Sequence, residues 1–335
     1  MTNHAIARIT AVGAYLPPRT LTNSDLEKIV NTSDDWIFSR TGMRERRIAE
    51  KEECTSDMGA KAALKALFAS NLPANAIEMI IVATMSPDYI SPSTAALIQA
   101  KIGAERAAAM DIQVACSGFV YGLSLAKAYI ESGIYNQVLV IAAEKMSAFI
   151  DYQDRSSCVL FGDGAGAAIV GSKGSGLAIN TTCLGADGQL ADLFVIPAGG
   201  AKQPASKETV DQKLHYVKMA GSDIFKHAVR RMTAAAKECL EKSGLKEEQI
   251  KWLIPHQANI RIISAVAKQF NLPIDRVYKK TLPKYGNTSA STVAIALSEL
   301  LEQEQLQEED HLLLVAFGGG LTWGASILTK ITEPV

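Results

Sequence analysis

One cysteine of this chain lies where a nucleophile is expected. Cys116 ends a stretch from residue 111 that reads as a buried strand, and it is followed by Ser-Gly and a helical pattern. The sequence therefore predicts a strand-to-helix junction at this residue. The unpaired amides and positive dipole end of a starting helix favour a thiolate, which is the nucleophilic form of cysteine. Catalysis at Cys116 would also need a base or hydrogen-bonding partner from elsewhere in the fold.

Two polar residues at similar junctions are candidate partners. His256 follows the apolar stretch 252–255 and precedes a helical pattern, and Asn287 lies in "KYGNTSAST" before another. An amide cannot lose a proton, so near a developing negative charge it remains a hydrogen-bond donor. Taken singly, a histidine is a weak signal and an asparagine is commonly a turn residue or helix cap. Their interpretation as partners depends on the repeat described below.

The other cysteines and histidines are expected to be structural or solvated. They are Cys54, Cys158, Cys183, Cys239, His4, His215, His227 and His311. No C-x-x-C pair or metal-ligand spacing occurs, so a zinc site or disulfide framework is not predicted. The glycines of "FGGGLTWG" fit no phosphate-binding motif, but this loop follows a strand and could present a backbone N–H to an oxyanion.

Short apolar strands alternate with helical patterns along the whole chain, which is typical of an α/β fold. The pattern also repeats: residues 56–104 match 222–270, and the later strands at 136–144 and 164–172 match 310–319 and 322–330. The repeat places Cys116 opposite Asn287 and predicts duplicated halves related by a pseudo-twofold axis. Ligands in such folds bind near the carboxyl ends of strands, where Cys116, His256 and Asn287 are expected.

Two domains are predicted from this repeat. The first half spans residues 1–172 and carries the cysteine; the second spans 173–335 and carries the histidine and asparagine. The second half begins with an irregular excursion to about residue 215, rich in Gly, Pro and polar residues, that reads as a connection or lid.

Composition restricts the class of protein. Apolar residues make up 48% of the 335, charged residues 21%, and the formal net charge is −1. These values are typical of a globular enzyme and argue against nucleic acid as the main partner. No apolar run is long enough to span a membrane, so a cytoplasmic protein with reduced thiols is predicted.

Six motifs in order resemble the β-ketoacyl-[acyl-carrier-protein] synthase III family of the thiolase superfamily. They are "NTSDDWIFSRTGMRERRIA", "ACSGFVYGL", "DRSSCVLFGDGAGAA", "PHQANIRII", "YGNTSAST" and "FGGGLTWGA". The resemblance covers nearly the whole chain. It implies a thiolase-like fold of two βαβαβ halves, layered α/β/α/β/α, and the initiating condensation of type II fatty acid synthesis.

The resemblance implies a role for each candidate residue. Cys116 would be the nucleophile that takes an acyl group from acyl-CoA, with the backbone N–H groups of Cys116 and Gly319 as the oxyanion hole. His256 and Asn287 would hydrogen bond to malonyl carrier protein and stabilise the enolate formed as carbon dioxide leaves. The product would be a 3-ketoacyl carrier protein, and no cofactor is implied because acyl-CoA is a substrate.

The resemblance also suggests binding residues. Trp36 would stack on the CoA adenine with Arg155 on its other side, and Arg40 would lie near the nucleotide phosphates. Lys226, Arg230 and Arg261 are candidates for contacting the acidic carrier protein. The neighbouring basic run at residues 44–47, "RERR", is expected to be a solvated surface.

The family forms homodimers, and one position departs from its pattern. Ser91 stands where many relatives have a phenylalanine that reaches into the acyl pocket of the partner subunit. The smaller side chain would widen that pocket, so the usual preference for acetyl-CoA is not assumed.

Three alternatives remain open from the sequence. The chain could be a superfamily relative, such as an alkylquinolone, polyketide or hydroxymethylglutaryl-CoA synthase. It could be a thioesterase or hydrolase, because Cys-His-Asn sets also serve hydrolysis. The weakest alternative is a module that binds carrier protein without catalysis.

Overall fold

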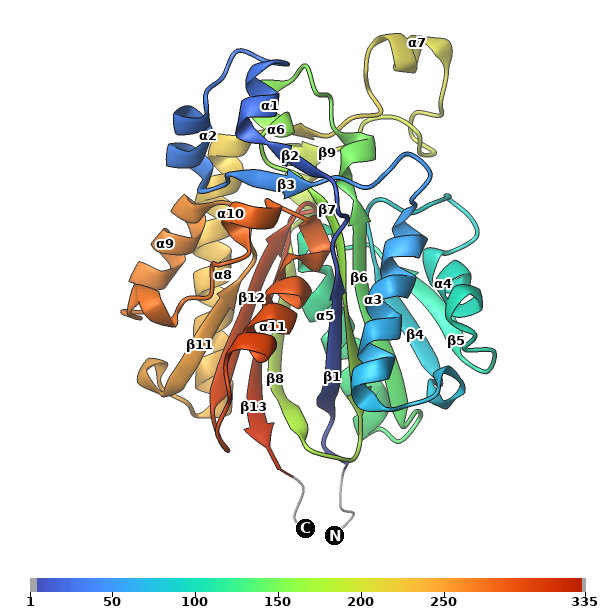
Figure 1. The fold of residues 1–335 in the computed structure, drawn as a ribbon. Coiled ribbons are helices and arrows are strands. Elements are labelled where there is room, and N and C mark those ends of the chain that lie inside the picture. The colour runs from blue at the N-terminus through green and yellow to red at the C-terminus, as the bar shows by residue number, and fades with distance from the viewer. Residues whose placement is uncertain (1–4, 333–335) are drawn as a thin grey trace.

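The computed structural model describes residues 5–332, which form a mixed α/β fold around one large sheet (Figure 1). Nine strands make up this sheet in the order β11-β12-β13-β8-β1-β7-β6-β4-β5. In chain order they are β1 Arg8–Tyr15, β4 Met79–Ala83, β5 Ala108–Ile112, β6 Gln137–Lys145, β7 Asp163–Gly171, β8 Gly176–Ala186, β11 Ile250–Pro255, β12 His311–Gly318 and β13 Thr322–Ile331. Four short strands form two small sheets: β2 Thr20–Thr22, β3 Glu45–Arg47, β9 Phe194–Val195 and β10 Lys218–Met219.

The helices fall into long ones that pack on the sheet and short ones in the connections. The long helices are α3 Thr55–Ser70, α4 Thr94–Ile102, α5 Gly118–Glu131, α8 Gly221–Ser243, α9 Ile260–Gln269 and α11 Thr292–Gln303. The short α-helices are α1 Asn23–Glu27, α2 Asp34–Thr41, α6 Arg155–Cys158, α7 Lys207–Asp211 and α10 Leu282–Tyr285. Two single-turn 3₁₀ segments, η2 Ala115–Ser117 and η7 Ser289–Ser291, lead directly into α5 and α11.

Three hydrophobic cores produce a layered arrangement. Helices α3 and α4 cover one part of the sheet, α8 and α9 cover the other, and α5 and α11 lie between the two parts (Figure 1). In the large sheet the two parts meet where β1 pairs with β8, over two residue pairs. Strand β4 is buried throughout, as expected for a strand covered on both faces. The predicted α/β/α/β/α layering is confirmed.

The same strand order occurs twice, which confirms the predicted duplication. The first part reads β5-β4-β6-β7-β1, and the second reads β11-β12-β13-β8. In the second part the counterpart of β5 is reduced to one parallel bridge, from Val277 to Leu253 on β11. The division of the chain after residue 172 falls in the connection from β7 to β8 and stays a prediction.

The predicted register between the halves is wrong by three residues. The turns η2 and η7 share their backbone conformation, with positive φ at Ala115 (46°) and Ser289 (52°) and a helix that starts three residues later. At this offset Cys116 corresponds to Ala290, and Asn287 corresponds to Gln113. The sequence comparison paired Cys116 with Asn287, whereas in the structure the turns η2 and η7 are the equivalent segments.

Segment 186–215 contains more structure than the sequence indicated. It holds the 3₁₀ segment Gly188–Leu193, strand β9 and the capped helix α7, and β9 pairs with β10. Helix α7 lies at the top of the molecule in Figure 1, well away from the two termini.

One residue of the basic run 44–47 was also predicted wrongly. Arg46 is fully buried, and its guanidinium donates to Asn23 Oδ1 (2.8 Å) and to the Val159 carbonyl (2.7 Å). Burial lowers its pKa to about 10. Arg46 therefore joins β3 to the segment after α6, while Arg44 pairs with Asp34 and Arg47 with Glu45 near the surface.

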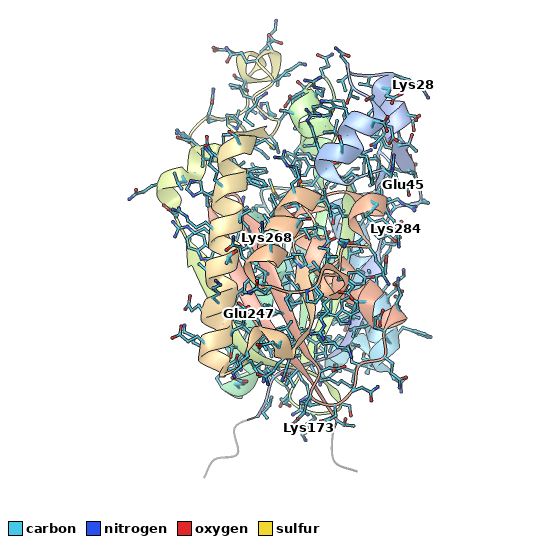
Figure 2. All side chains as sticks on the ribbon, turned by 90° about the vertical axis from the view of Figure 1, so that its left-hand side faces the viewer. Lys28, Glu45, Lys173, Glu247, Lys268 and Lys284 are labelled. Carbon is cyan, nitrogen blue, oxygen red and sulfur yellow. The ribbon has the colours of Figure 1, made fainter. Side chains whose placement is uncertain are left out.

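The outside of the molecule carries charged side chains. In Figure 2 the charged residues Lys28 and Lys173 lie at the upper and lower edges of the molecule, whereas Glu247 and Lys268 lie near the middle of this view. Within residues 5–332, no helix combines the length and apolar character needed to cross a bilayer.

Candidate active site

Cys116, His256 and Asn287 line one pocket, although they lie far apart in the chain. Cys116 is supplied by η2, His256 follows β11, and Asn287 precedes η7. All three are buried, with exposed fractions of 6%, 3% and 6%. The fold thus brings together the three residues that the sequence analysis selected.

The Cys116 thiol is held in its neutral form. Its Sγ donates to Ser289 Oγ at 3.5 Å, and burial raises its pKa to about 12, with the nearby Glu144 charge acting in the same direction. The sequence analysis expected a thiolate because of the helix start. Burial outweighs that effect in the resting protein, so a proton must leave Cys116 before it can attack.

His256 is a neutral imidazole. Burial lowers its pKa to about 3. Its backbone N–H donates to the Val315 carbonyl (2.7 Å), and its Nδ1 lies 2.6 Å from Thr292 Oγ1. The Thr292 hydroxyl has one proton, which it can donate either to Nδ1 or to the Ser289 carbonyl at 3.2 Å. When Thr292 donates to Nδ1, the proton of the imidazole is on Nε2, which can then donate.

Asn287 is oriented as a donor. Its Oδ1 accepts the backbone N–H of Ser289 at 2.9 Å, so its amide NH₂ is turned away from that contact. The backbone of Asn287 is fixed by Leu160 and Gly162, which exchange hydrogen bonds with its N–H (2.9 Å) and carbonyl (3.0 Å). An amide NH₂ and a neutral imidazole in one pocket can hydrogen bond to a developing oxyanion or enolate.

The glycine loop approaches the cysteine turn closely. A β-carbon at Gly318 would lie 2.6 Å from the backbone N of Cys116, so the end of β12 can reach this turn only with glycine. Gly319 lines the same pocket and packs on the Phe194 ring. This places the loop beside Cys116, where an oxyanion hole would require it.

The remaining walls of the pocket are apolar. They are formed by Leu160, Phe161, Phe194, Met219, Ile224, Ala228, Met232, Ile262, Phe317 and Leu321. An apolar lining excludes water and strengthens the few polar contacts inside. The site is therefore suited to chemistry on a thioester in a dry channel.

The three predicted CoA-binding residues form a cluster. The guanidinium groups of Arg40 and Arg155 lie 4.5 and 4.7 Å from the centre of the Trp36 ring. Arg155 also donates to the Asn31 carbonyl at 2.9 Å. With both arginines over the indole, an adenine can stack on Trp36 only if one of them moves.

The three predicted carrier-protein contacts lie on the outer surface of α8 and α9. Lys226 pairs with Asp223 (3.1 Å), Arg230 contacts His227 (3.2 Å), and the Arg261 guanidinium lies 5.5 Å from the Phe225 ring. All three are exposed, and buried residues of the same helices line the pocket. The cations thus border the elements that enclose Cys116.

Ser91 is not brought to the pocket within this chain. It lies in an exposed loop beside Tyr89 and Ile90, whose exposed fractions are 61% and 90%. A role for Ser91 in an acyl pocket therefore depends on a second subunit and stays a prediction.

The sequence analysis missed the residues that connect to the three central ones. Ser289 contacts Cys116, and Thr292 contacts His256. Glu144 accepts a hydrogen bond from Ser289 Oγ at 2.9 Å. Glu144 could have been noticed, because it is an acidic residue at the carboxyl end of the otherwise apolar strand β6. Nothing in the pattern indicated the link from Ser289 to Cys116.

The remaining cysteines and histidines are largely as expected. Cys158, Cys183 and Cys239 are buried, and Cys54 is partly exposed. His215 and His311 bond to threonines, His227 contacts Arg230, and His4 lies outside the described residues. The search of the described part of the chain found no group of three His, Cys, Asp or Glu placed to hold a metal ion.

Comparisons with known proteins agree on one family. Residues 110–188 match the model for 3-oxoacyl-[acyl-carrier-protein] synthase III, and residues 240–330 match the model for its C-terminal part. The β-ketoacyl-[acyl-carrier-protein] synthase III of Chlamydia muridarum is 56% identical, over 97% of this chain and 99% of that protein. The corresponding protein of Caldanaerobacter subterraneus is 52% identical, over 96% and 97%. The crystal structure of 3-oxoacyl-[acyl-carrier-protein] synthase III from Aquifex aeolicus superposes with a TM-score of 0.89 at 45% identity and covers 97% of this chain and 100% of that one.

Proposed function

The chain belongs to the 3-oxoacyl-[acyl-carrier-protein] synthase III family, and we propose that it catalyses the decarboxylating condensation that initiates type II fatty acid synthesis. It is an acyltransferase: an acyl group moves from acyl-CoA to Cys116 and is then joined to malonyl carrier protein. The observation that carries this proposal is the shared pocket, in which a thiol faces two neutral donors within apolar walls.

In the first half-reaction the Cys116 sulfur attacks the thioester carbonyl of acyl-CoA. The carbonyl oxygen becomes an oxyanion, which the backbone N–H groups of Cys116 and Gly319 stabilise. The close approach of Gly318 to the Cys116 amide supports this arrangement. CoA leaves as a thiolate and takes a proton from water, and the acyl group remains on Cys116.

In the second half-reaction malonyl carrier protein enters the same pocket. Neutral His256 donates from Nε2, and Asn287 donates from its NH₂ group, to the thioester oxygen of the malonyl unit. These bonds stabilise the enolate as carbon dioxide leaves, and no strong base is needed. The carbanion attacks the acyl-cysteine, and a 3-ketoacyl carrier protein is released.

The substrates are bound by two separate surfaces. Trp36, Arg40 and Arg155 hold the CoA nucleotide, and their clustering at one place supports this assignment. Lys226, Arg230 and Arg261 contact the acidic carrier protein beside the helices that line the pocket. The protein acts in the cytoplasm as a homodimer, with Ser91 in the partner's acyl pocket, and requires no metal or organic cofactor.

The test is intact-protein mass spectrometry after incubation with a panel of acyl-CoAs. We expect a mass increase equal to one acyl group on Cys116, and none in Cys116→Ala. The panel also identifies the primer, whose length Ser91 is expected to influence. Acyl uptake by Cys116→Ala would disprove the nucleophile assignment.

The same incubation distinguishes the alternatives. A hydrolase would release free acid and would need no malonyl carrier protein. A related synthase would form its product from malonyl-CoA or from aromatic or long acyl primers. A module that only binds carrier protein would gain no mass from any acyl-CoA.

A further inference from the structure

A chain of polar contacts leads from Cys116 away from the substrate pocket into the protein interior. Cys116 Sγ donates to Ser289 Oγ at 3.5 Å, and Ser289 Oγ donates to Glu144 Oε1 at 2.9 Å. Ser289 and Glu144 are both fully buried. The proposed condensation gives no task to this carboxyl group, although burying it is costly.

The surroundings of Glu144 are built to hold an ionised carboxylate. Besides Ser289, it accepts hydrogen bonds from Thr84 Oγ1 (3.1 Å), from the backbone amides of Met85 and Ser86, and from the Ala290 N–H (3.4 Å). The Ser86 hydroxyl also donates to it. Every one of these partners can donate. These donors therefore offset part, but not all, of the cost of burying the carboxylate.

The three hydroxyl groups that donate to Glu144 have little freedom to act otherwise. Thr84 Oγ1 accepts the Ser86 N–H at 3.1 Å, and Ser86 Oγ accepts the Lys145 N–H at 2.9 Å. Their own protons are thereby directed to Glu144. Ser289 has the same arrangement, because its oxygen accepts from Cys116 and its proton points to the carboxylate.

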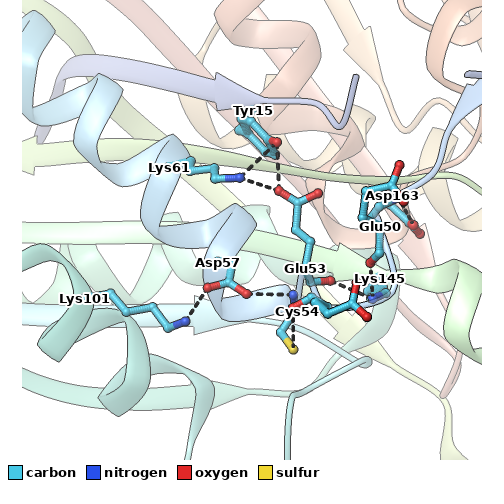
Figure 3. Close-up of polar contacts among 11 residues, drawn as sticks. Tyr15, Glu50, Glu53, Cys54, Asp57, Lys61, Lys101, Lys145 and Asp163 are labelled. Atoms are coloured by element: carbon cyan, nitrogen blue, oxygen red, sulfur yellow. Dashed lines mark hydrogen bonds and ion pairs between the residues drawn. The ribbon is translucent and has the colours of Figure 1, made fainter. Parts of the chain in front are cut away.

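No described cation balances the charge of Glu144 through a direct contact. The next residue, Lys145, turns its ammonium to the carbonyls of Glu50, Lys51 and Glu53 (Figure 3). Asp163, paired with Lys145 across β6 and β7, accepts from Ala49 and Ser147 instead. His256 is neutral and connects to this region only through Thr292. The titratable group that Glu144 can reach is the Cys116 thiol.

Two negative charges cannot be held by this pair. Burial raises the pKa of Glu144 to about 7, and burial together with the Glu144 charge raises the pKa of Cys116 to about 12. Loss of the thiol proton to solvent would leave a thiolate beside a carboxylate in a dry interior. Transfer of that proton to Glu144 avoids this, because the single negative charge only moves from oxygen to sulfur.

We propose that Glu144 takes and stores the Cys116 proton through the Ser289 hydroxyl. The S–H bond breaks as its proton passes to Ser289 Oγ, and the original Ser289 proton passes to Glu144 Oε1. The freed electron pair on sulfur attacks the thioester carbonyl. This inference rests on the proposed nucleophilic role of Cys116 and makes Ser289 a catalytic residue and Glu144 a positioning residue.

The reverse transfer completes the cycle. While Cys116 carries the acyl group, Glu144 holds the proton as a neutral acid. When the tetrahedral adduct of the condensation collapses, Cys116 leaves as a thiolate and recovers that proton through Ser289. The carboxyl group is thus regenerated in each turnover, and no proton has to cross the apolar pocket.

The test is the pH dependence of Cys116 alkylation by iodoacetamide, with the modified peptide identified by mass spectrometry. In the native protein we expect the rate to rise with a midpoint near pH 7 and then to level off. Glu144→Gln should lower the rate at pH 7.5 at least tenfold and remove the plateau. A role through charge alone gives the opposite sign, because removal of a nearby negative charge would make the thiolate easier to form and raise the rate.

Ser289→Ala tests the bridge while keeping the Glu144 charge. It should lower the rate as Glu144→Gln does, and its backbone N–H can still bind Asn287. The matched control is Ser291→Ala, a buried serine of the same turn whose hydroxyl donates to the Thr288 carbonyl at 2.9 Å. This control should keep the native profile, and thermal unfolding should verify that each variant is folded.

An unchanged or increased rate in either Glu144→Gln or Ser289→Ala would overturn the proposal. The alkylation assay uses no acyl-CoA, so its result is independent of the reaction that the protein catalyses. If Cys116→Ala still took up acyl groups, the proposed function would fail while the alkylation profiles would still be informative. The two failures are therefore distinguishable.

Discussion

The turns η2 and η7 have the same backbone conformation but different surroundings. Each has a residue with positive φ, then two residues that lead into a central helix, and their helix starts have φ and ψ of −56°, −43° and −56°, −45°. At η2 the side chain of Cys116 faces a pocket. At η7 the corresponding Ala290 faces a carboxylate, because its N–H lies 3.4 Å from Glu144 Oε1.

The strands beneath the two turns explain this difference. Strands β4 and β11 end at Ala83 and Pro255, which pair with Ala142 of β6 and Val315 of β12. Two residues further along lie Glu144 and Phe317, respectively. Phe317 leaves an apolar opening beside η2, whereas Glu144 fills the equivalent place beside η7 with a hydrogen-bonded charge.

The duplicated halves thus contain two turns of similar shape that can accept an anion. The residues beside the two turns differ, and they give each turn different surroundings. In the proposed mechanism, the Cys116 amide of one turn donates to a substrate oxyanion. The other binds a carboxylate of the protein itself and, through Ser289, connects that carboxylate to the first. Variants that affect one turn and spare the other test this comparison.

The largest effect is expected from the donors beside the open turn. His256→Ala and Asn287→Ala should each reduce release of labelled carbon dioxide from malonyl carrier protein by about 10³-fold, because the enolate loses a donor in a dry site. Acylation of Cys116, measured by mass, should be largely retained. His311→Ala is the control, since His311 also bonds to a threonine (2.8 Å) but lies at the far end of β12. Unchanged carbon dioxide release would refute the division of labour.

The glycine beside the open turn should come next. A methyl group in Gly318→Ala would lie 2.6 Å from the Cys116 amide, so the loop must move and the oxyanion hole is disturbed. We expect acyl uptake to slow by roughly 10²-fold in rapid-quench measurements. Gly200→Ala meets no neighbour within 4 Å and should be silent. Normal uptake by Gly318→Ala would show that β12 does not constrain the turn.

The contact between the two turns should have a smaller effect. Gly118 corresponds to Thr292, and its added β-carbon would lie 2.5 Å from Ala83 Cβ and 3.2 Å from Ala290 Cβ. Overpacking in Gly118→Ala should lower the free energy of unfolding in urea by about 2 kcal/mol. Gly221→Ala is the control, because Gly221 also starts a helix and its added β-carbon would meet only a methionine methyl at 3.5 Å. The difference between the two variants removes the change in helix propensity that both share. Equal stability of the two variants would contradict the tight contact.

The effect that is smallest at neutral pH is the acid dependence that His256 gives to stability. Its pKa is lowered to about 3 in the folded protein, so below its unfolded value of 6.5 only the unfolded chain binds the proton. Stability is present above pH 6.5 and falls with pH by about 1.4 kcal/mol per unit, until the folded form also protonates. In urea titrations at several pH values, the free energy of unfolding of His256→Gln should lack this dependence on pH. It should keep the separate pH dependence that Glu144 contributes. Parallel pH curves for the two proteins would mean that His256 is protonated in the folded state.

The sequence predicted the chemistry and the order of the elements well. Cys116 and His256 each follow a predicted strand, and such strand-end positions can be read from local patterns because strand and helix periods differ. The repeat predicted the duplicated halves because each βα unit repeats its own hydrophobic pattern. The error in register arose because Asn287 was matched to Cys116 as a polar residue, although the turns are defined by the positive φ of Ala115 and Ser289.

Only the tertiary structure decided the protonation states and the link between the halves. A cysteine at a helix start suggests a thiolate, and only its burial shows that the thiol is neutral. Arg46 looked solvated in its basic run, and packing alone placed it in the interior. Residues 116, 144 and 289 share no local pattern, because their contact depends on how the two parts of the large sheet pack around helices α5 and α11. The sequence by itself selected Cys116, His256 and Asn287; the packing determined that they share one pocket and which groups surround them.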